Sequence, residues 1–556
     1  MFEYGRSGWL GSRILIEDLK GLETGKTLSV DICVVGAGPA GITIANEFIG
    51  SGLSVCLVES GGLSDELETQ ALYQGENIGH PVVMDEGRYR LFGGAATRWG
   101  GRCAVLDPID FEARDWVRKS GWPVDLEMLR PYYERAKHAS NFAEPWIPDE
   151  EVPETLGIDL PLFNSINVNP FVWRVAPGDI PSSLKNLGRP RPRFDWGRAY
   201  RDPLKADPRT HVLLHANLKA LAGNEDGSRI ESIMVESLTG ASMTIKAVRF
   251  VICCGGIENI RLLLNAPSNI LHKLNQHDNL GRYLAQHPRG CIATLDTTPE
   301  AAARLQNLFT DFLRPSGVQY EVGFALSESA QRENGLLNAS AAMYYAARPE
   351  SAWKAAARLR EAVTTAKPYG GMLRDGGQIV GESGSVVANT WRRIQGVPMI
   401  LPNPIASLIV DLEQEPNPDS RITLSAEKDP LGMQRAKVDW RISEIERTTA
   451  RYFSGFIGDV LKRLGLGQTQ PSEWLNGNRP VGGDDLHGTY HFIGATRMAK
   501  DPRDGVVDEN CRAHGVTNLY LAGCSVFPTG GHANPTLTIL ALAIRLADHL
   551  RAEVAN

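Results

Sequence analysis

A glycine-rich turn near the N-terminus constrains the fold of this chain more than any other feature. Residues 34–41 read Val-Val-Gly-Ala-Gly-Pro-Ala-Gly, which contains the pattern G-x-G-x-x-G. A buried strand is predicted over 28–35 and a helix over 39–51, and a second strand over 54–58 ends at Glu59. The sequence therefore predicts a strand–helix–strand unit that binds a dinucleotide.

Each glycine of this turn has its own physical task. Gly36 permits the tight turn, Gly38 lets the backbone approach a pyrophosphate, and Gly41 lets the helix pack closely on the strand. The helix N-terminus adds N–H donors and a positive dipole. Glu59 lies 23 positions after Gly36, near the distance expected for an acidic residue that binds ribose hydroxyls. The unit alone does not distinguish FAD from NAD.

A second glycine cluster follows at 92–101, which reads Phe-Gly-Gly-Ala-Ala-Thr-Arg-Trp-Gly-Gly. Consecutive glycines tolerate positive φ and let the backbone approach a flat ligand. The alternative is a surface loop, but two large aromatic residues make a fully solvated loop a poor explanation. We expect this cluster to line the cofactor through Gly93, Gly94, Thr97, Arg98, Trp99 and Gly100.

Composition limits the partners and the compartment. The 556 residues carry a net charge of −7, which gives no general attraction for nucleic acid. The eight cysteines include no C-x-x-C pair, so we expect reduced thiols and a cytoplasmic protein. The first 26 residues lack the apolar core of a secretory signal, and no stretch reaches the roughly 18 apolar residues of a membrane span.

The remainder of the chain alternates in character. Strands are predicted at 211–215, 230–237, 248–253 and 519–522, with helices at 257–266 and near the C-terminus. The stretch 120–200 contains Pro-Trp-Ile-Pro at 145–148 and Arg-Pro-Arg-Pro at 189–192, which favour extended backbone over long helices. Residues 290–480 look like a second domain inserted into the first. They contain a helical piece at 352–366 and a Gly-rich stretch, so 370–400 is predicted to be a mobile loop.

Several longer motifs resemble one known family. They are Cys254-Gly-Gly-Ile-Glu-Asn-Ile-Arg-Leu-Leu-Leu264, Asn279-Leu-Gly-Arg-Tyr-Leu-Ala-Gln-His-Pro288, Tyr490-His-Phe-Ile-Gly-Ala-Thr-Arg-Met498 and Gly531-His-Ala-Asn-Pro-Thr-Leu-Thr538. Together with the two glycine clusters, they resemble the glucose–methanol–choline (GMC) oxidoreductases. Within that superfamily the chain is similar to the pyranose oxidases and glycoside 3-oxidases.

The resemblance implies a fold and a domain arrangement. It implies an α/β, Rossmann-like FAD-binding domain of the GMC and p-hydroxybenzoate hydroxylase type, with an inserted α+β substrate domain built on an antiparallel sheet. We expect the FAD domain to comprise residues 1–165, 206–290 and 483–556. The substrate domain is then expected to comprise 166–205 and 291–482.

The resemblance also implies the catalytic pair, His491 and Asn534. In the pyranose oxidase branch the matching His and Asn face the substrate beside flavin N5. An imidazole titrates near neutral pH and can take the hydroxyl proton of an alcohol, while a carboxamide can orient that hydroxyl. Gly523, Cys524, Asn534 and Thr536 are expected beside the cofactor, and His532 is a candidate for substrate contact.

Arg98 marks a departure from the pyranose oxidases, where a histidine at this position is covalently linked to the flavin. Arginine cannot form that linkage, so dissociable FAD is expected. The non-covalent form favours C3 oxidation of a glycoside, with C2 oxidation open and O2 or another acceptor taking the electrons. The alternatives are a non-sugar alcohol such as a polyol or steroid, NAD in place of FAD, or a flavin-binding protein without turnover.

For three residues of these motifs we also expect structural roles or no role in the chemistry. Glu258 is expected to favour the N-terminus of its helix through the dipole, and His287 is assigned no chemistry. Asn534 followed by Pro535 is expected to be an N-cap and the first helical residue.

Overall fold

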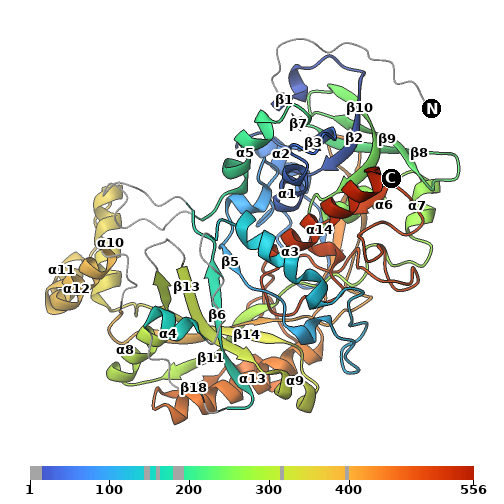
Figure 1. The fold of residues 1–556 in the computed structure, drawn as a ribbon. Coiled ribbons are helices and arrows are strands. Elements are labelled where there is room, and N and C mark those ends of the chain that lie inside the picture. Colours follow the sequence, from blue (N-terminus) through green and yellow to red (C-terminus); the bar gives the residue numbers. More distant parts are fainter. Residues whose placement is uncertain are drawn as a thin grey trace.

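Two large β-sheets organise the structure, a computed structural model (Figure 1). It describes residues 16–142, 151–157, 163, 165–178, 193–313, 319–394 and 400–555. The Pro-rich motifs at 145–148 and 189–192 lie outside these residues, as do residues 1–15 of the N-terminal segment that lacks a predicted secretory signal.

The first sheet carries the dinucleotide unit. Its strand order is β1-β7-β3-β2-β10-β9-β8, and β19 pairs with β10. The strands are β1 (Ile16–Asp18), β2 (Lys26–Val35), β3 (Val55–Val58), β7 (Thr210–Leu214), β8 (Asn217–Gly223), β9 (Ile230–Glu236), β10 (Ser242–Ile252) and β19 (Leu519–Leu521). Pairing is parallel from β1 to β10 and to β19, whereas β9 and β8 form an antiparallel edge. The predicted α/β domain is confirmed.

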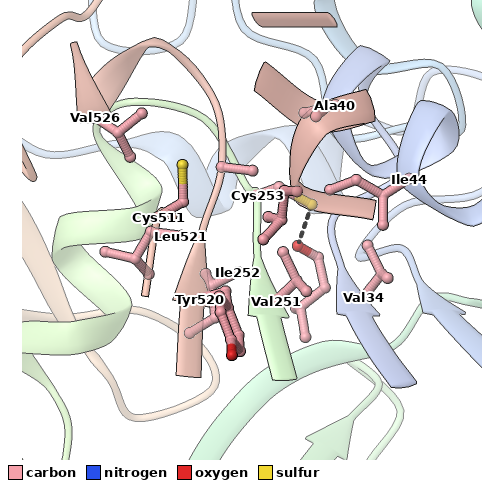
Figure 2. Close-up of a cluster of buried hydrophobic side chains, with 14 of the residues drawn as sticks. Val34, Ala40, Ile44, Val251, Ile252, Cys253, Cys511, Tyr520, Leu521 and Val526 are labelled. Carbon is pink, nitrogen blue, oxygen red and sulfur yellow. Dashed lines mark hydrogen bonds between the residues drawn. The ribbon is translucent and has the colours of Figure 1, made fainter. Parts of the chain in front are cut away.

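The centre of this sheet is apolar because both of its faces are covered. Helix α1 (Pro39–Glu47) follows β2 and packs its buried residues against the sheet, as Figure 2 shows for Ala40 and Ile44 above Val34 and Val251. Helix α1 ends before the expected Ser51. Gly50 and Gly52 follow it with φ of 73° and 83°, which an α-helix cannot accommodate.

The second sheet is antiparallel throughout and confirms the inserted α+β domain. Its order is β18-β11-β15-β14-β13-β6-β5, and β12 pairs with β13. The strands are β5 (Arg102–Cys103), β6 (Val168–Val175), β11 (Arg289–Asp296), β12 (Asp311–Leu313), β13 (Gln319–Leu326), β14 (Ala339–Ala346), β15 (Ile405–Leu412) and β18 (Gln468–Pro471). Helix α13 (Glu444–Arg463) packs against one face of this sheet.

A small third sheet and the remaining helices complete the fold. The sheet has the order β16 (Arg421–Lys428), β17 (Gln434–Asp439), β4 (Glu76–Asn77). The helices are α2 (Leu67–Gln70), α3 (Leu126–Ala139), α4 (Val152–Leu156), α5 (Trp196–Ala206), α6 (Glu258–Leu264), α7 (Ser268–Leu274), α8 (Pro299–Leu308), α9 (Glu328–Asn334), α10 (Ala352–Thr365), α11 (Met372–Gly381), α12 (Ser383–Ile394) and α14 (Thr536–Ala555). None of the helices within the described ranges is long and apolar enough to cross a membrane.

The prediction of extended backbone over 120–200 is wrong at both ends of that stretch. Helix α3 contains Pro131 and α5 contains Pro203. A proline inside a helix costs about 3 kcal/mol, so other interactions must offset it. Asp125 caps α3 by accepting from Met128 N at 2.8 Å, and α3 packs on α14, where Tyr133 Oη lies 2.8 Å from Thr538 Oγ1. The stabilisation from capping and packing therefore offsets the free-energy cost of the proline in α3.

The prediction of a mobile loop over 370–400 is also wrong, because α11 and α12 occupy most of it. Residues 395–399 lie outside the described part. Arg358 of α10 makes a two-pronged ion pair with Asp375 of α11, with N···O distances of 2.8 and 2.7 Å. This contact holds the glycine-rich helix on its neighbour, and local glycine content could not reveal it.

Candidate active site

The first glycine loop has the geometry expected of it. Gly36 has a φ of 106°, and a Cβ at this position would lie 2.7 Å from the carbonyl oxygen of Cys253. A Cβ on Gly41 would lie 1.9 Å from the Gly36 oxygen, so the helix can pack on the turn only with glycine there. Gly38 lines a cavity, and a Cβ on it would meet no protein atom within 4 Å. Protein packing therefore does not require glycine at position 38, and the absence of a side chain there leaves room for a ligand.

The second glycine cluster packs directly on the first. Gly93 N donates to Ala37 O at 2.8 Å, and a Cβ on Gly94 would lie 3.0 Å from the Cα of Gly38. Gly94 and Gly100 line the same cavity as Gly38. Gly93 and Thr97 lie outside the lining. Thr97 instead donates to Gly94 O at 2.9 Å and supports the turn.

Glu59 lines the cavity from the end of β3. Its carboxylate accepts from Ala37 N at 2.9 Å and from Gly61 N at 2.8 Å. These bonds fix the carboxylate beside the glycine turn. Oε1 also accepts from Ser60 Oγ at 3.1 Å, whereas Oε2 has a second lone pair that can accept from a ribose hydroxyl.

The C-terminal motif lines the same cavity. Gly523, Cys524, Asn534 and Thr536 line it. Strand β19 runs parallel to β10, so the turn that follows it lies at the carboxyl edge of the first sheet, next to the glycine loop. Helix α14 begins at Thr536, and Ile539 N donates to Pro535 O at 2.8 Å. Pro535 therefore takes the cap position, one residue later than expected for Asn534.

The cavity has a volume of about 1010 Å³ and is lined by residues of both large sheets. This volume is at the upper end of the roughly 300–1,000 Å³ typical of small-molecule sites. The first sheet contributes backbone-rich turns, and the second contributes polar side chains. His491 and Asn534 both belong to this lining.

His491 is held by its Nδ1 atom. Nδ1 lies 2.9 Å from Nδ1 of His287 and 3.0 Å from Oγ1 of Thr489. Burial, together with the nearby His287, holds the pKa of His491 well below its ordinary value. Burial also lowers the pKa of His287, to about 4. Both imidazoles are therefore neutral at neutral pH, which is the form of His491 that can accept a proton.

His287, which the sequence interpretation assigned no chemistry, thus contacts the candidate base directly. It is 1% exposed, and its Nε2 lies 3.3 Å from the carbonyl oxygen of Gly530. The stretch 279–288 was recognisable as a family motif. Its contact with residue 491 was not, because the two lie 204 positions apart.

Arg98 and Trp99 both line the cavity. Arg98 is half exposed, makes an ion pair with Asp65 and lies over the ring of Tyr89, 4.9 Å from its centroid. Trp99 Nε1 donates to Phe194 O at 2.7 Å, and its ring packs against the cores of both large sheets. Trp99 therefore lies where the two parts of the molecule meet.

His532, the candidate for substrate contact, lies elsewhere. It is 2% exposed and falls outside the lining that the described residues give the cavity. Its Nε2 lies 3.2 Å from Oδ2 of Asp107, and its ring packs edge-on against Phe171. The carboxylate raises the pKa of His532 against the opposing effect of burial. The residue supports the loop that leads to Asn534.

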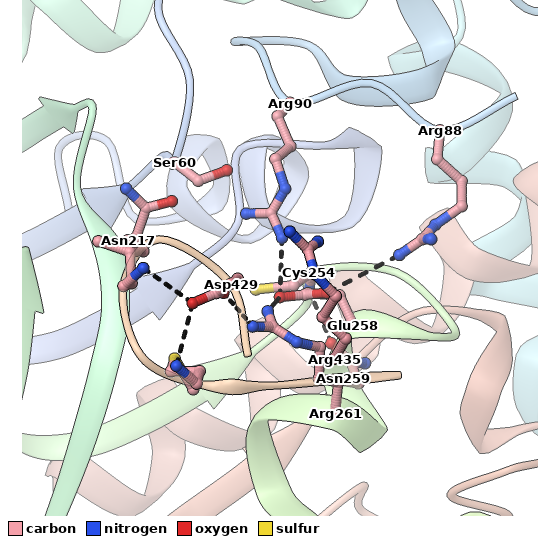
Figure 3. A network of polar contacts seen from close by, with 12 residues as sticks. Ser60, Arg88, Arg90, Asn217, Cys254, Glu258, Asn259, Arg261, Asp429 and Arg435 are labelled. Atoms are coloured by element: carbon pink, nitrogen blue, oxygen red, sulfur yellow. Dashed lines mark hydrogen bonds and ion pairs between the residues drawn. The ribbon is translucent and has the colours of Figure 1, made fainter. Parts of the chain in front are cut away.

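The interpretation of Glu258 as a helix-favouring residue is incomplete. Glu258 is buried, lines the cavity and pairs with Arg90 at 2.8 Å, Arg261 at 2.6 Å and Arg88 at 3.8 Å (Figure 3). Burial opposes ionisation, yet these guanidinium groups hold the pKa of Glu258 at about 2. Arg261 also pairs with Asp429.

This arginine cluster has a surplus of positive charge. Three guanidinium groups (Arg88, Arg90, Arg261) face two carboxylates (Glu258, Asp429), which leaves one positive charge. Within the described chain Arg90 Nε is buried without a hydrogen-bond partner. A buried unpaired donor is costly, so an acceptor on a bound ligand would suit it. The empty space at Gly38 and this donor fit a dinucleotide with an anionic pyrophosphate.

Polar side chains of the second sheet form the remaining wall, which carries no motif. Arg102 pairs with Glu321 at 2.5 Å and bonds to Tyr344 Oη at 3.0 Å. Arg193 donates to Gln319 at 2.7 Å, and Arg289 makes a two-pronged pair with Asp411. Burial raises the pKa of Asp311, against the opposing effects of Arg102 and Arg193. Tyr345 Oη is buried and has no partner within the described residues.

Comparison with known families decides the identity of this architecture. Residues 416–543 match the family model described as GMC oxidoreductase. These residues form the C-terminal domain of a GMC oxidoreductase. The chain is an enzyme that uses FAD to oxidise CH–OH groups, and the predicted cofactor is confirmed.

Relatives extend over nearly the whole chain at low identity. The 6'''-hydroxyparomomycin C oxidase of Streptomyces lividus is 24% identical, over 96% of this chain and 94% of its own length. The 2-methyl-1,2-propanediol dehydrogenase of Mycolicibacterium austroafricanum is also 24% identical, over 94% of this chain and 95% of its own. Among solved structures, a fungal aryl-alcohol oxidase has a TM-score of 0.55 at 13% identity, covering 95% of this chain and 99% of that one. At 13% identity, the likeness to the aryl-alcohol oxidase shows a similar fold and nothing more.

Proposed function

We propose that this GMC oxidoreductase oxidises a ring secondary alcohol of a pyranose or glycoside, preferably at C3, to a keto-sugar. The observation that carries the proposal is the joint position of His491 and Asn534 in the lining of one cavity, between the glycine turns and a polar wall. His491 would act as the base and Asn534 as a hydrogen-bond donor to the reacting oxygen.

The chemistry of this chain's residues follows from that arrangement. Neutral His491 accepts the hydroxyl proton of the substrate, which makes loss of hydride from the same carbon easier. Asn534 orients the oxygen and stabilises its developing charge. Bound FAD supplies the two-electron acceptor, which O2 or another acceptor then reoxidises. Gly36, Gly38, Gly41, Glu59 and Arg90 would hold its dinucleotide part.

The polar wall supports a hydroxyl-rich substrate. It presents Arg102, Glu321 and Asp311 together with tyrosine hydroxyls, and burying such groups is costly unless they form hydrogen bonds. A sugar ring offers a hydroxyl on nearly every carbon and can satisfy them. Arg102 and Glu321 already pair with each other, but the buried hydroxyl of Tyr345 has no partner within the described residues, and a steroid would leave it unpaired. Two relatives named as a C-glycoside 3-oxidase and a pyranose 2-oxidase, which match 12% and 25% of this chain, favour the same class of substrate.

A second candidate is oxidation of a small non-sugar alcohol. The observation in its favour is the full-length relative that acts on 2-methyl-1,2-propanediol, which is as similar in identity as the first. A small diol would contact only part of the polar wall.

A substrate panel tests the two candidates. Sugars, glycosides and short diols are mixed without oxygen with the purified holoenzyme, and bleaching of the visible flavin absorbance is followed. We expect rapid bleaching by glycosides, with NMR of the product locating the new ketone at C3. Bleaching by diols alone would overturn the sugar proposal.

We further propose that the FAD is dissociable, because position 98 carries an arginine that lines the cavity. Acid precipitation of the holoenzyme should give a colourless pellet and a yellow supernatant. A yellow pellet would show a covalent link at another residue.

A further inference from the structure

His491 has two ring nitrogens, and the direction of its hydrogen bonds decides which one can act as a base. A neutral imidazole carries its proton on one nitrogen and a lone pair on the other. The contacts of Nδ1 determine the tautomer through two separate chains of hydrogen bonds. Both chains end at backbone carbonyl oxygens, which can only accept.

The first chain passes through His287. Its Nε2 lies 3.3 Å from Gly530 O, so this nitrogen carries the proton and donates. His287 is neutral and has only this one ring proton, so its Nδ1 holds a lone pair. That Nδ1 lies 2.9 Å from Nδ1 of His491, which must therefore be the donor of the pair.

The second chain passes through Thr489. Its hydroxyl lies 3.1 Å from the carbonyl oxygen of His287 and donates its single proton there. The oxygen of the same hydroxyl lies 3.0 Å from Nδ1 of His491 and can only accept from it. This chain does not depend on the protonation of the His287 ring, yet it leads to the same tautomer.

We propose that His287 and Thr489 are positioning residues that hold His491 as the Nδ1–H tautomer, which leaves Nε2 as the atom that takes the substrate proton. This inference rests on the proposed function for its chemical step. In that step the O–H bond of the substrate breaks and the proton forms a bond to Nε2. The C–H electron pair leaves as a hydride to FAD, and a C=O bond forms.

The two acceptors have a second effect once the proton has been transferred. The imidazolium of His491 then carries protons on both nitrogens, and Nδ1–H still faces the lone pairs of His287 and Thr489. Hydrogen bonds to a charged donor are stronger than those to a neutral one. The same residues that select the tautomer therefore stabilise the protonated base.

Nitrogen NMR tests the tautomer without any substrate. The holoenzyme is labelled with ¹⁵N-histidine, and the His491 signals are identified by their loss in His491→Gln. At neutral pH we expect a protonated, pyrrole-type Nδ1 and an unprotonated, pyridine-type Nε2. An unprotonated Nδ1 would overturn the proposal, even if the enzyme oxidises sugars as proposed.

Two pairs of variants test the effect on the reaction. Thr489→Val removes the hydroxyl with little change of shape, and Thr489→Ser keeps it. His287→Phe removes the acceptor nitrogen, and His287→Asn offers an amide oxygen near the same place. Thr489→Val and His287→Phe should slow anaerobic FAD reduction at saturating substrate by about 10- to 100-fold, which is part of the rate enhancement that a general base contributes. KM and FAD content should change little.

The conservative variants separate positioning from folding. Thr489→Ser and His287→Asn should reduce FAD at least several-fold faster than Thr489→Val and His287→Phe. Reduction by Thr489→Val and His287→Phe at the wild-type rate would overturn the inference. If none of the sugars bleaches the flavin of the wild-type enzyme, the proposed function fails. The NMR result still decides the tautomer in that case.

Discussion

The two ends of the cavity are built by different means. The nucleotide end consists of turns that only glycine permits, because of positive φ at Gly36 and Gly94 and because of close packing at Gly41. The substrate end consists of side chains from strands far apart in sequence, such as Arg102 on β5, Arg289 on β11 and Glu321 on β13. A backbone turn requires a short local pattern, whereas a wall of side chains leaves none. The fold can therefore keep its cofactor site while the substrate wall varies.

The largest effect is expected where the two ends meet. His491→Ala removes the proposed base, and a general base contributes about 10²–10⁴-fold to rate. Anaerobic bleaching of the flavin by a glycoside should slow by that factor, and the FAD content of the purified variant should stay at the wild-type level. Stopped-flow absorbance measures the first and the protein-to-flavin ratio the second.

His272→Ala is the matched control, because His272 is exposed on α7 and is not among the residues that line the cavity. It should bleach at the wild-type rate. An unchanged rate in His491→Ala would remove residue 491 from the mechanism and would place the base on the substrate wall instead.

A smaller effect is expected at the nucleotide end. A Cβ on Gly38 meets no protein atom within 4 Å but projects where the dinucleotide should lie. Gly38→Ala should therefore weaken FAD binding by about 1–3 kcal/mol, the usual cost of overpacking, or roughly 5- to 150-fold in Kd. Fluorescence titration of the apoenzyme with FAD measures this change. The midpoint temperature of thermal unfolding of the apoenzyme should not fall.

Gly377→Ala provides the comparison for this variant. Gly377 is exposed on α11, and its Cβ would also meet nothing within 4 Å. Its FAD affinity should equal that of the wild type. Equal affinity for Gly38→Ala would show that the cofactor does not approach this turn, which would contradict the assignment of the nucleotide end.

The contrast between the two ends also explains which features the sequence could predict. Gly36, Gly38 and Gly41 could be assigned individually, because each belongs to one turn of eight residues. Helix α11 could not, since the ion pair between Arg358 and Asp375 that holds it joins it to a separate helix, α10. A local pattern predicts structure only where the determining contacts are themselves local.

The same reasoning applies to the candidate site. The motifs of the last seventy residues led to His491 and Asn534, and both line the cavity. The roles of their supporting residues could not be predicted, because these residues make contacts with residues that are distant in sequence. His287 contacts His491 from 204 positions away, and Glu258 pairs with Arg90. The segment boundaries of the two proposed domains stay a prediction.

The smallest effect is expected at the substrate wall, where many groups share the binding of one ligand. Asp311 lines the cavity at the edge of the second sheet, and burial raises the pKa of its carboxyl. As a carboxylate it accepts from a sugar hydroxyl more strongly than a neutral amide would, by about 1 kcal/mol. Asp311→Asn should therefore raise KM for a glycoside by roughly five-fold, with kcat little changed, because the contact is equally strong in the ground and transition states. Asp459→Asn, at an exposed position on α13, should leave both constants unchanged. A fall in kcat at constant KM would instead mean that Asp311 acts on the reacting oxygen, and the division between a catalytic centre and a binding wall would then have to move toward β12.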